Sequence, residues 1–203
     1  MADRYEVRLS GSGGQGIILM GIILAEAIGI HGGKCVAQTQ SYGPEARGGS
    51  SKSEVVVSDE EIDYPKAMKP DLLLAMSQKS CDEYYSDLKE EGALIVDSTF
   101  VTQVPLSRAY EIPFTRIARE KFKREVVANI IALGALTQLT PIVSSKAMEA
   151  AVLARVPKGT EKLNRDALKA GIAAARKAKQ EWGNAGPQTA LQSKDLAGDS
   201  VEP

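Results

Sequence analysis

The order of apolar and polar positions divides most of the chain into alternating strands and helices. Strands are predicted where short runs alternate or are continuously apolar, at Tyr5–Leu9, Cys35–Thr39, Ser53–Ser58, Asp71–Met76, Ala93–Asp97 and Ala109–Pro113. Helices are predicted at Ile17–Ile28, Ser77–Leu88, Phe114–Phe122, Val126–Leu139, Ser144–Arg155 and Glu161–Trp182, with a further short helix at Ile62–Met68. Strands that alternate with helices predict an α/β domain.

The connection between the second and third strands predicts the sheet type. Parallel strands need a crossover of about a dozen residues or more, which is usually helical. The segment Gln40–Ser50 is short and has no helical period. We therefore expect these two strands to be antiparallel and the sheet to be mixed.

Two segments stand out by composition. The helix Ile17–Ile28 is apolar nearly all round, so it is expected to be buried on most faces or covered by another subunit. Residues 183–203 have little periodicity and many small or polar side chains, which predicts a disordered tail after a single domain over residues 1–182.

Charge and hydropathy narrow the classes of function. The 203 residues include 25 Lys and Arg and 26 Asp and Glu, which argues against a protein that holds nucleic acid by bulk electrostatics. No apolar run approaches the length of a membrane-spanning helix, and the N-terminus enters a strand pattern at once. We expect a cytoplasmic protein that binds neither nucleic acid nor membrane.

The residues that bind metals or act as nucleophiles are few. Cys35 and Cys81 lie far apart without a CxxC pattern, so this chain alone cannot form a tetrathiolate iron–sulfur or zinc site. The single histidine, His31, stands beside two glycines at a predicted helix end, where a capping contact is more common than catalysis. No catalytic residue or metal ligand is predicted.

A glycine-rich segment joins the first strand to the apolar helix. Gly11, Gly13 and Gly16 satisfy G-x-G-x-x-G, which allows a tight turn and aims helix N–H groups at an anion. A dinucleotide site also needs an acid at the end of the second strand, where this chain has Thr39-Gln40-Ser41. The open alternatives are an anionic ligand of another kind, a site completed by a partner, or tight packing alone.

A second loop and a helical amide are further candidates. Between Gly43-Pro44 and Gly48-Gly49 stand Glu45 and Arg47, and the guanidinium of Arg47 suits a phosphate or carboxylate. The alternative is a surface hairpin loop. Asn129, within an apolar helix, either caps a neighbouring loop or touches a ligand.

These segments together resemble the gamma subunit of the 2-oxoacid:ferredoxin oxidoreductases. The resemblance lies in Gly11–Gly16 (GSGGQG) with its apolar helix, Ser41–Gly49 (SYGPEARGG) and Ser53–Val57 (SEVVV), and it extends over Tyr5–Lys179. It is greatest for the 2-oxoglutarate enzyme, although the pyruvate, branched-chain and indolepyruvate enzymes have similar subunits. The resemblance implies a Rossmann-like three-layer domain with a mixed, mostly parallel sheet.

It also implies a reaction in which a 2-oxoacid, coenzyme A and oxidised ferredoxin give an acyl-CoA, carbon dioxide and reduced ferredoxin. Thiamine diphosphate, magnesium and iron–sulfur clusters are then expected on alpha, beta and possibly delta partner subunits. By this analogy Gly13, Gly14, Gln15 and Gly16 face the active-site cleft on the side of coenzyme A, and Arg47 faces a phosphate. A purely structural subunit and a free-standing nucleotide-binding protein remain as alternatives.

Overall fold

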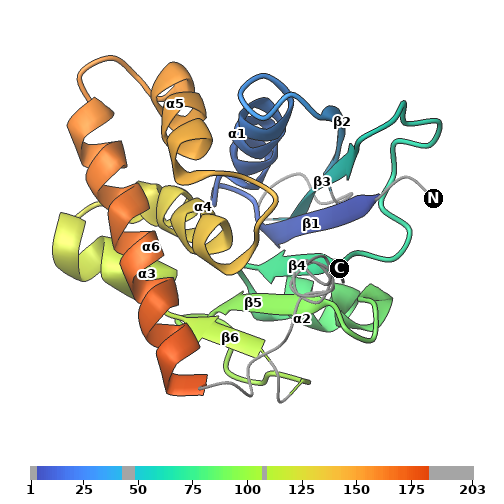
Figure 1. Ribbon diagram of the computed structural model, residues 1–203. Helices are drawn as coiled ribbons and strands as arrows, with labels where there is room; N and C mark the ends of the chain where they lie inside the picture. Colours follow the sequence, from blue (N-terminus) through green and yellow to red (C-terminus); the bar gives the residue numbers. More distant parts are fainter. Residues whose placement is uncertain (1–3, 43–48, 107–108, 183–203) are drawn as a thin grey trace, which may run out of the picture.

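A single six-stranded sheet forms the centre of the molecule (Figure 1). The computed structural model describes residues 4–42, 49–106 and 109–182. The strand order is β2-β3-β1-β4-β5-β6. The bounds are β1 Tyr5–Ser12, β2 Cys35–Tyr42, β3 Ser50–Ser58, β4 Leu72–Ala75, β5 Ala93–Asp97 and β6 Ala109–Ile112.

The sheet is mixed, as predicted. Strand β3 runs antiparallel to both β1 and β2, whereas β1, β4, β5 and β6 are parallel to one another. The first three strands are longer than predicted. Gly11 and Ser12 still pair with Ser51 and Ser50, so the ladder continues into the glycine segment.

Helices cover the two faces of the sheet unequally. The helical elements are α1 Ile17–Gly29, α2 Gln78–Tyr84, a 3-10 turn Tyr85–Asp87, α3 Phe114–Ile117, a π-helical turn Ala118–Phe122, a 3-10 turn Glu125–Val127, α4 Ala128–Leu139, α5 Ser145–Arg155 and α6 Glu161–Trp182. Residues of α1, α4, α5 and α6 share one large hydrophobic cluster with one face of the sheet, while α2 contributes Cys81 to a smaller cluster on the other face. This is the three-layer α/β arrangement that was expected.

The short helix predicted at Ile62–Met68 is wrong: this segment contains only bends. The charged side chains of Arg4, just before β1, and of Glu6 in β1 hold its backbone instead. Arg4 donates to the carbonyl oxygens of Tyr64 and Lys66, at 2.9 Å each. The Glu6 carboxylate accepts from the amide of Met68 at 2.7 Å, so backbone groups that a helix would use are bonded to the sheet.

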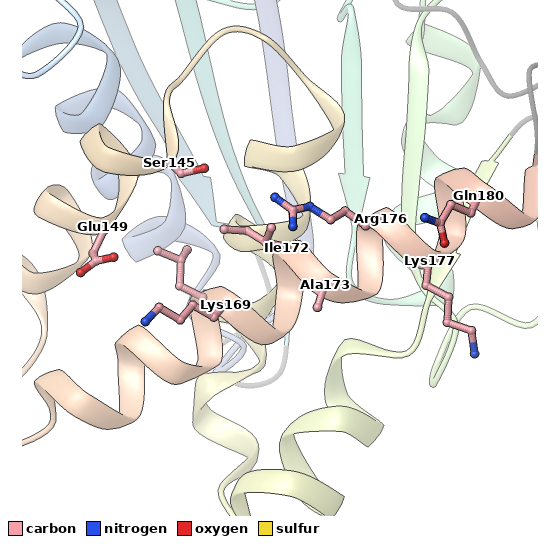
Figure 2. A pocket seen from close by; sticks show the side chains of 9 residues that line it. Ser145, Glu149, Lys169, Ile172, Ala173, Arg176, Lys177 and Gln180 are labelled. Atoms are coloured by element: carbon pink, nitrogen blue, oxygen red, sulfur yellow. The ribbon is translucent and has the colours of Figure 1, made fainter.

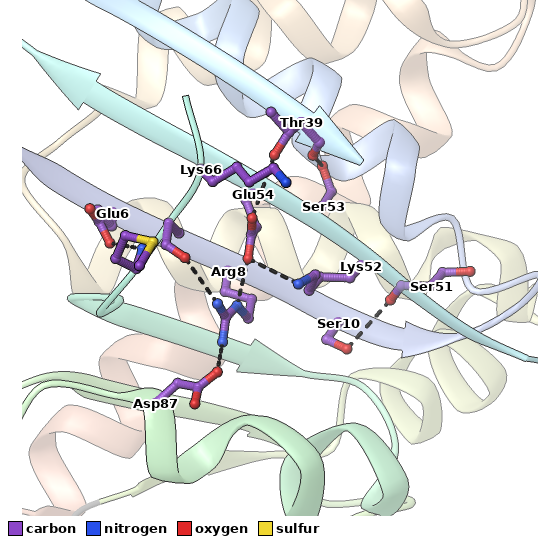
Figure 3. Close-up of polar contacts among 12 residues, drawn as sticks. Glu6, Arg8, Ser10, Thr39, Ser51, Lys52, Ser53, Glu54, Lys66 and Asp87 are labelled. Carbon is purple, nitrogen blue, oxygen red and sulfur yellow. Dashed lines mark hydrogen bonds and ion pairs between the residues drawn. The ribbon is translucent and has the colours of Figure 1, made fainter. Parts of the chain in front are cut away.

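Polar side chains of β1 also form a buried cluster on the face of the sheet opposite α1 (Figure 3). The guanidinium of Arg8 donates to Glu54 at 2.8 Å, to Asp87 and to the carbonyl of Ala67 at 3.1 Å. It also lies 5.1 Å from the ring centroid of Tyr84. Burying this cation is tolerated because it is paired and its donors are satisfied.

Two serines cap helices at their predicted starts. The side chain of Ser77 accepts a hydrogen bond from the amide of Ser80, and that of Ser144 accepts one from Ala147. None of the helices in the described part of the chain is both long and apolar enough to cross a bilayer. The predicted tail, residues 183–203, lies outside the described residues.

Candidate functional site

The glycine segment lies where the order of strands reverses. From β1 the chain passes through α1 to β2 and β3 on one side, and it continues to β4 on the other side of β1. In open α/β sheets, ligands bind outside the carboxyl ends of the strands at such a switch point. Residues 13–16 connect the carboxyl end of β1 directly to α1 at this point.

Two glycines give this turn a left-handed backbone. Gly14 has φ +91° and Gly16 has φ +74°, a region that most side chains disfavour. A Cβ on Gly14 would have no atom within 4 Å, so the position is open. A Cβ on Gly16 would lie 2.3 Å from Nδ2 of Asn129, so here the protein itself occupies the space.

The side chain of Gln15 points inward and holds the turn. Its Oε1 accepts from the amide of Ser12 at 2.7 Å, and its Nε2 donates to the carbonyl of Met76 at 2.9 Å. The amide of Gly13 donates to the carbonyl of Gly49 at 2.8 Å. Gln15 therefore fixes the turn to the end of β4, and Gly13 joins it to the start of β3.

The start of α1 is left uncapped. Gly16 occupies the N-cap position and has no side chain to accept from the first turn. The first amides of a helix have no intrahelical acceptor, so they can donate to a ligand. The partial positive charge at this end favours an anion.

A cavity of about 380 Å³ adjoins the turn. Its lining comes from the glycine turn, the residue after β4, α3, and the 3-10 turn that leads into α4, namely Gly13, Gly14, Gln15, Met76, Thr115, Glu125, Val126 and Ala128. Thr115 is oriented by the buried Asp97, whose carboxylate accepts from the Thr115 hydroxyl at 2.5 Å and from its amide at 3.1 Å. The sequence analysis did not single out Thr115; its position shortly after the strand β6 is the signal that could have found it.

The charge around this cavity is already partly balanced. Glu125 accepts from Arg119 at 2.8 Å, and this hydrogen bond raises the pKa of the Arg119 guanidinium. No lysine or arginine lines the cavity within the described residues. A phosphate here would need a cation from elsewhere; Arg47, the predicted candidate, lies outside the described residues.

Asn129 is brought to the glycine turn. It is buried near the start of α4, its Oδ1 accepts from the amide of Ile130 at 2.8 Å, and its Nδ2 faces Gly16. Of the two roles open to it from sequence, the structure favours support of the turn.

The predicted metal-binding and capping candidates lie apart. Cys35 is exposed on β2, whereas Cys81 is buried in α2. No group of three His, Cys, Asp or Glu side chains suited to a metal occurs among the residues that were searched, which are the described ones. His31 is exposed just beyond α1, and its amide donates to the carbonyl of Glu26 at 3.4 Å.

A second cavity, of about 500 Å³, lies between α5 and α6 (Figure 2). Its lining comes only from these two helices and includes the cations Lys169, Arg176 and Lys177. Arg176 bonds to Gln138 of α4 at 2.9 Å. No strand end or loop contributes to this cavity. The cavity beside the glycine turn, at the switch point of the sheet, is therefore the better candidate for a ligand.

The fold and the turn define a class: an α/β domain with a glycine-rich turn and an uncapped helix start at the switch point of its sheet. The chain belongs to the pyruvate ferredoxin/flavodoxin oxidoreductase family, whose model matches residues 6–174.

Individual relatives narrow the comparison. The chain is 54% identical over 177 residues to 2-oxoglutarate synthase subunit KorC of Methanocaldococcus jannaschii, covering 85% of this chain and 95% of that protein. It is 37% identical over 134 residues to ketoisovalerate oxidoreductase subunit VorA of Methanothermobacter thermautotrophicus, covering 66% of this chain but 28% of that protein.

A solved structure is similar over the same region. It is the gamma subunit of a keto/oxoacid ferredoxin oxidoreductase from Geobacter sulfurreducens, with a TM-score of 0.77 and 49% identity. The match covers 85% of this chain and 99% of that one.

Proposed function

We propose that this chain is the gamma subunit of a cytoplasmic 2-oxoglutarate:ferredoxin oxidoreductase and forms part of the coenzyme A side of its active site. The observation that carries the proposal is the 54% identity to a 2-oxoglutarate synthase subunit, spanning 95% of that protein. The ketoisovalerate relative is less similar, at 37% identity.

The complex converts 2-oxoglutarate, coenzyme A and two oxidised ferredoxins into succinyl-CoA, carbon dioxide, two reduced ferredoxins and a proton. Thiamine diphosphate with magnesium supplies the carbon–carbon cleavage and iron–sulfur clusters carry the electrons, and we assign these groups to alpha, beta and possibly delta subunits. The sequence contains only two cysteines, which are too few for a four-thiolate cluster. The role of this chain is therefore to bind and position coenzyme A.

The glycine turn is suited to the phosphate-bearing substrate. Gly14 leaves open space beside the uncapped start of α1, where backbone N–H groups can donate to a phosphate. Gly13 and Gly16 shape the turn, and Gln15 orients it through Ser12 and Met76. Arg47, in the sequence between β2 and β3, would add a charge-assisted bond to the same anion.

Activity measurements on the assembled complex test which 2-oxoacid is the substrate. We measure the reduction of a dye or of ferredoxin by the purified complex. We expect kcat/KM to be highest for 2-oxoglutarate and lower for pyruvate, branched-chain 2-oxoacids and indolepyruvate. The isolated chain, supplied with thiamine diphosphate and coenzyme A, should give no reduction. Activity of the single chain, or a preference for another 2-oxoacid, would overturn the assignment.

Substitutions at Gly14 test the coenzyme A site. Asp and Asn have similar size and both tolerate a left-handed backbone, so Gly14→Asp and Gly14→Asn differ mainly in charge. We expect Gly14→Asp to raise the KM for coenzyme A at least about tenfold, equivalent to roughly 1.4 kcal/mol, because its carboxylate repels a phosphate. Gly14→Asn should raise it less, and the KM for 2-oxoglutarate should change little in either variant.

Arg47→Ala should also raise the KM for coenzyme A, by a smaller factor than Gly14→Asp. Steady-state kinetics of the intact complex, varied separately in each substrate, measure both effects. Normal coenzyme A kinetics in complexes that contain Gly14→Asp or Arg47→Ala would show that the turn only packs.

The alternative is a purely structural gamma subunit, of this complex or of the pyruvate, branched-chain or indolepyruvate enzyme. The inward hydrogen bonds of Gln15 and Gly13 favour it, because these polar groups already have partners within the fold. The variants Gly14→Asp and Gly14→Asn separate the two candidate functions, since a purely structural role predicts that both change the KM for coenzyme A equally.

A further inference from the structure

Strand β2 forms one end of the sheet, and within the described residues no strand lies on its outer side (Figure 1). An edge strand presents unpaired backbone N–H and C=O groups that can pair with another extended chain. The question is whether this edge is protected against such pairing or built for it.

The hydrogen bonds of the inner strands show which residues of β2 face outward. The amides of Asp71 and Met76 donate to the carbonyl oxygens of Glu6 and Ser10, so the even-numbered residues of β1 face β4. Its odd-numbered residues then face β3, because in a strand the N–H and C=O of one residue point to the same side.

The register carries this alternation across to β2. The odd-numbered residues of β1 pair with odd-numbered residues of β3, so the backbone groups of the odd residues of β3 are directed at β1. The backbone groups of the even residues of β3 are therefore directed at β2, and one of these residues, Glu54, is paired with Thr39. The hydroxyl of Ser53 donates to the carbonyl of Thr39 at 3.4 Å, which agrees with an inward Thr39. The outward backbone groups therefore belong to Val36, Gln38, Gln40 and Tyr42.

The two edges of the sheet differ in the features that prevent pairing. The opposite edge, β6, has four residues, an exposed Glu111 and Pro113 directly after it. Short length, charge and proline are the usual protections of an edge. Strand β2 has eight residues, CVAQTQSY, without a charge or a proline.

An apolar stripe of α1 runs beside this open edge. Ile18 and Ile22 are half-buried and, unlike Leu19 and Ala25, do not pack against the main hydrophobic cluster of the described residues. Their spacing places them on one side of the helix with Gly29. A Cβ on Gly29 would lie 3.6 Å from Val36, so this side of α1 faces β2.

We propose that an uncharged, extended segment of a partner subunit adds to β2 as a further strand and packs apolar side chains on Ile18 and Ile22. The proposal rests on the proposed function, because it requires the other subunits of the complex. The outward amides and carbonyls of β2 give the affinity, and the stripe gives the preference for apolar side chains.

Two observations favour a partner subunit over a second copy of this chain. The region matching the ketoisovalerate relative covers only 28% of that protein, so there the same domain has further polypeptide attached to it. The edge also adjoins the candidate site: Tyr42 and Gly11 both pair with Ser51, which places them about 10 Å apart across the sheet. A strand added to β2 would therefore lie about three strand spacings from Gly11, which leads into the glycine turn.

Hydrogen exchange resolved to single amides tests the pairing. The full chain is measured alone at low concentration and in the complex assembled with its alpha and beta subunits. We expect the amides of Gln38 and Gln40 to exchange at least about tenfold more slowly in the complex. The amides of Ala37 and Thr39, which face β3, should be protected equally in both.

A proline at an outward position gives the matched variant. Gln40→Pro removes one outward donor and spares the ladder to β3, whereas Gln40→Thr keeps the donor and suits a strand. We expect Gln40→Pro to lower recovery of the complex at least about tenfold, and Gln40→Thr to leave it within about twofold. The melting temperature of each isolated chain checks that the fold is intact.

The outcomes separate the possibilities. Assembly of the wild-type chain with unchanged exchange at Gln38 and Gln40 overturns the pairing and leaves the proposed function standing. Protection that is already present in the dilute chain, or that rises with its concentration, identifies this chain or a second copy as the occupant and also overturns it. Failure of the wild-type chain to assemble overturns both proposals.

Discussion

Cys35 and Cys81 have opposite surroundings and should differ in reactivity. Cys35 is exposed, whereas Cys81 is fully buried beside Leu73 and Leu94, and burial, with a smaller contribution from Asp82, raises the pKa of the Cys81 thiol to about 11. The thiolate is the reactive form, so Cys81 stays protonated and inert in the folded chain near neutral pH.

Titration of the isolated chain with a thiol reagent at pH 8 measures this difference. One thiol should react quickly and the second only on unfolding in denaturant. The variant Cys35→Ser should lose the fast phase and keep the slow one. Fast modification of Cys81 in the native chain would contradict its placement.

The glycine turn shows what single residues in a sequence can and cannot reveal. The spacing of Gly11, Gly13 and Gly16 predicted a tight turn between a strand and a helix, and the structure has this turn between β1 and α1. The inward role of Gln15 could not be predicted, because Met76, its acceptor, is brought near only by the pairing of β1 with β4.

Arg8 illustrates a similar limit. Alternation along β1 predicts one apolar face with Val7 and Leu9 and one polar face, but it does not say that the polar face is buried. The partners of Arg8 are Glu54 and Asp87, which are 46 and 79 residues away. Such pairs follow from the topology and have no signature in local spacing.

Among the helices, α4 and α6 approach closely at a glycine. A Cβ on Gly171 of α6 would lie 1.8 Å from the carbonyl oxygen of Ile131 in α4. Helix propensity alone predicts that Gly171→Ala stabilises the chain by about 1 kcal/mol. We expect the opposite sign, a loss of about 1–3 kcal/mol, because the backbone of α4 cannot move aside.

Thermal unfolding of Gly171→Ala should show a fall in Tm of roughly 3–10 °C. Ala173, exposed on the same helix, provides the control: Ala173→Gly should cost only the propensity difference of about 1 kcal/mol. An increase in Tm for Gly171→Ala would mean that the two helices are not in contact there.

Helices with a clear period were predicted best. The bounds of α6 match the prediction, and α5 begins one residue after its predicted start, Ser144. The failed helix at Ile62–Met68 is short, and its backbone groups are bonded to Arg4, just before β1, and to Glu6 of β1. Tertiary hydrogen bonds therefore override local preference in this segment.

In the whole molecule, both hydrophobic clusters formed by the described residues lie between Tyr5 and Ala178. Removal of residues 183–203 takes nothing from these clusters. We therefore propose that the domain ends at Trp182 and that the remaining residues are dispensable for folding.

A chain ending at Trp182 tests this boundary by thermal unfolding. Its Tm should lie within about 4 °C of that of the full chain, since about 1 kcal/mol shifts the Tm of a domain this size by 2–4 °C. Assembly with the partner subunits should be measured on the same two chains, because a tail used only for assembly would leave the Tm unchanged and lower recovery of the complex. A fall of about 10 °C or more would mean that residues 183–203 contribute several kcal/mol of packing to the domain, and the boundary at Trp182 would then be wrong.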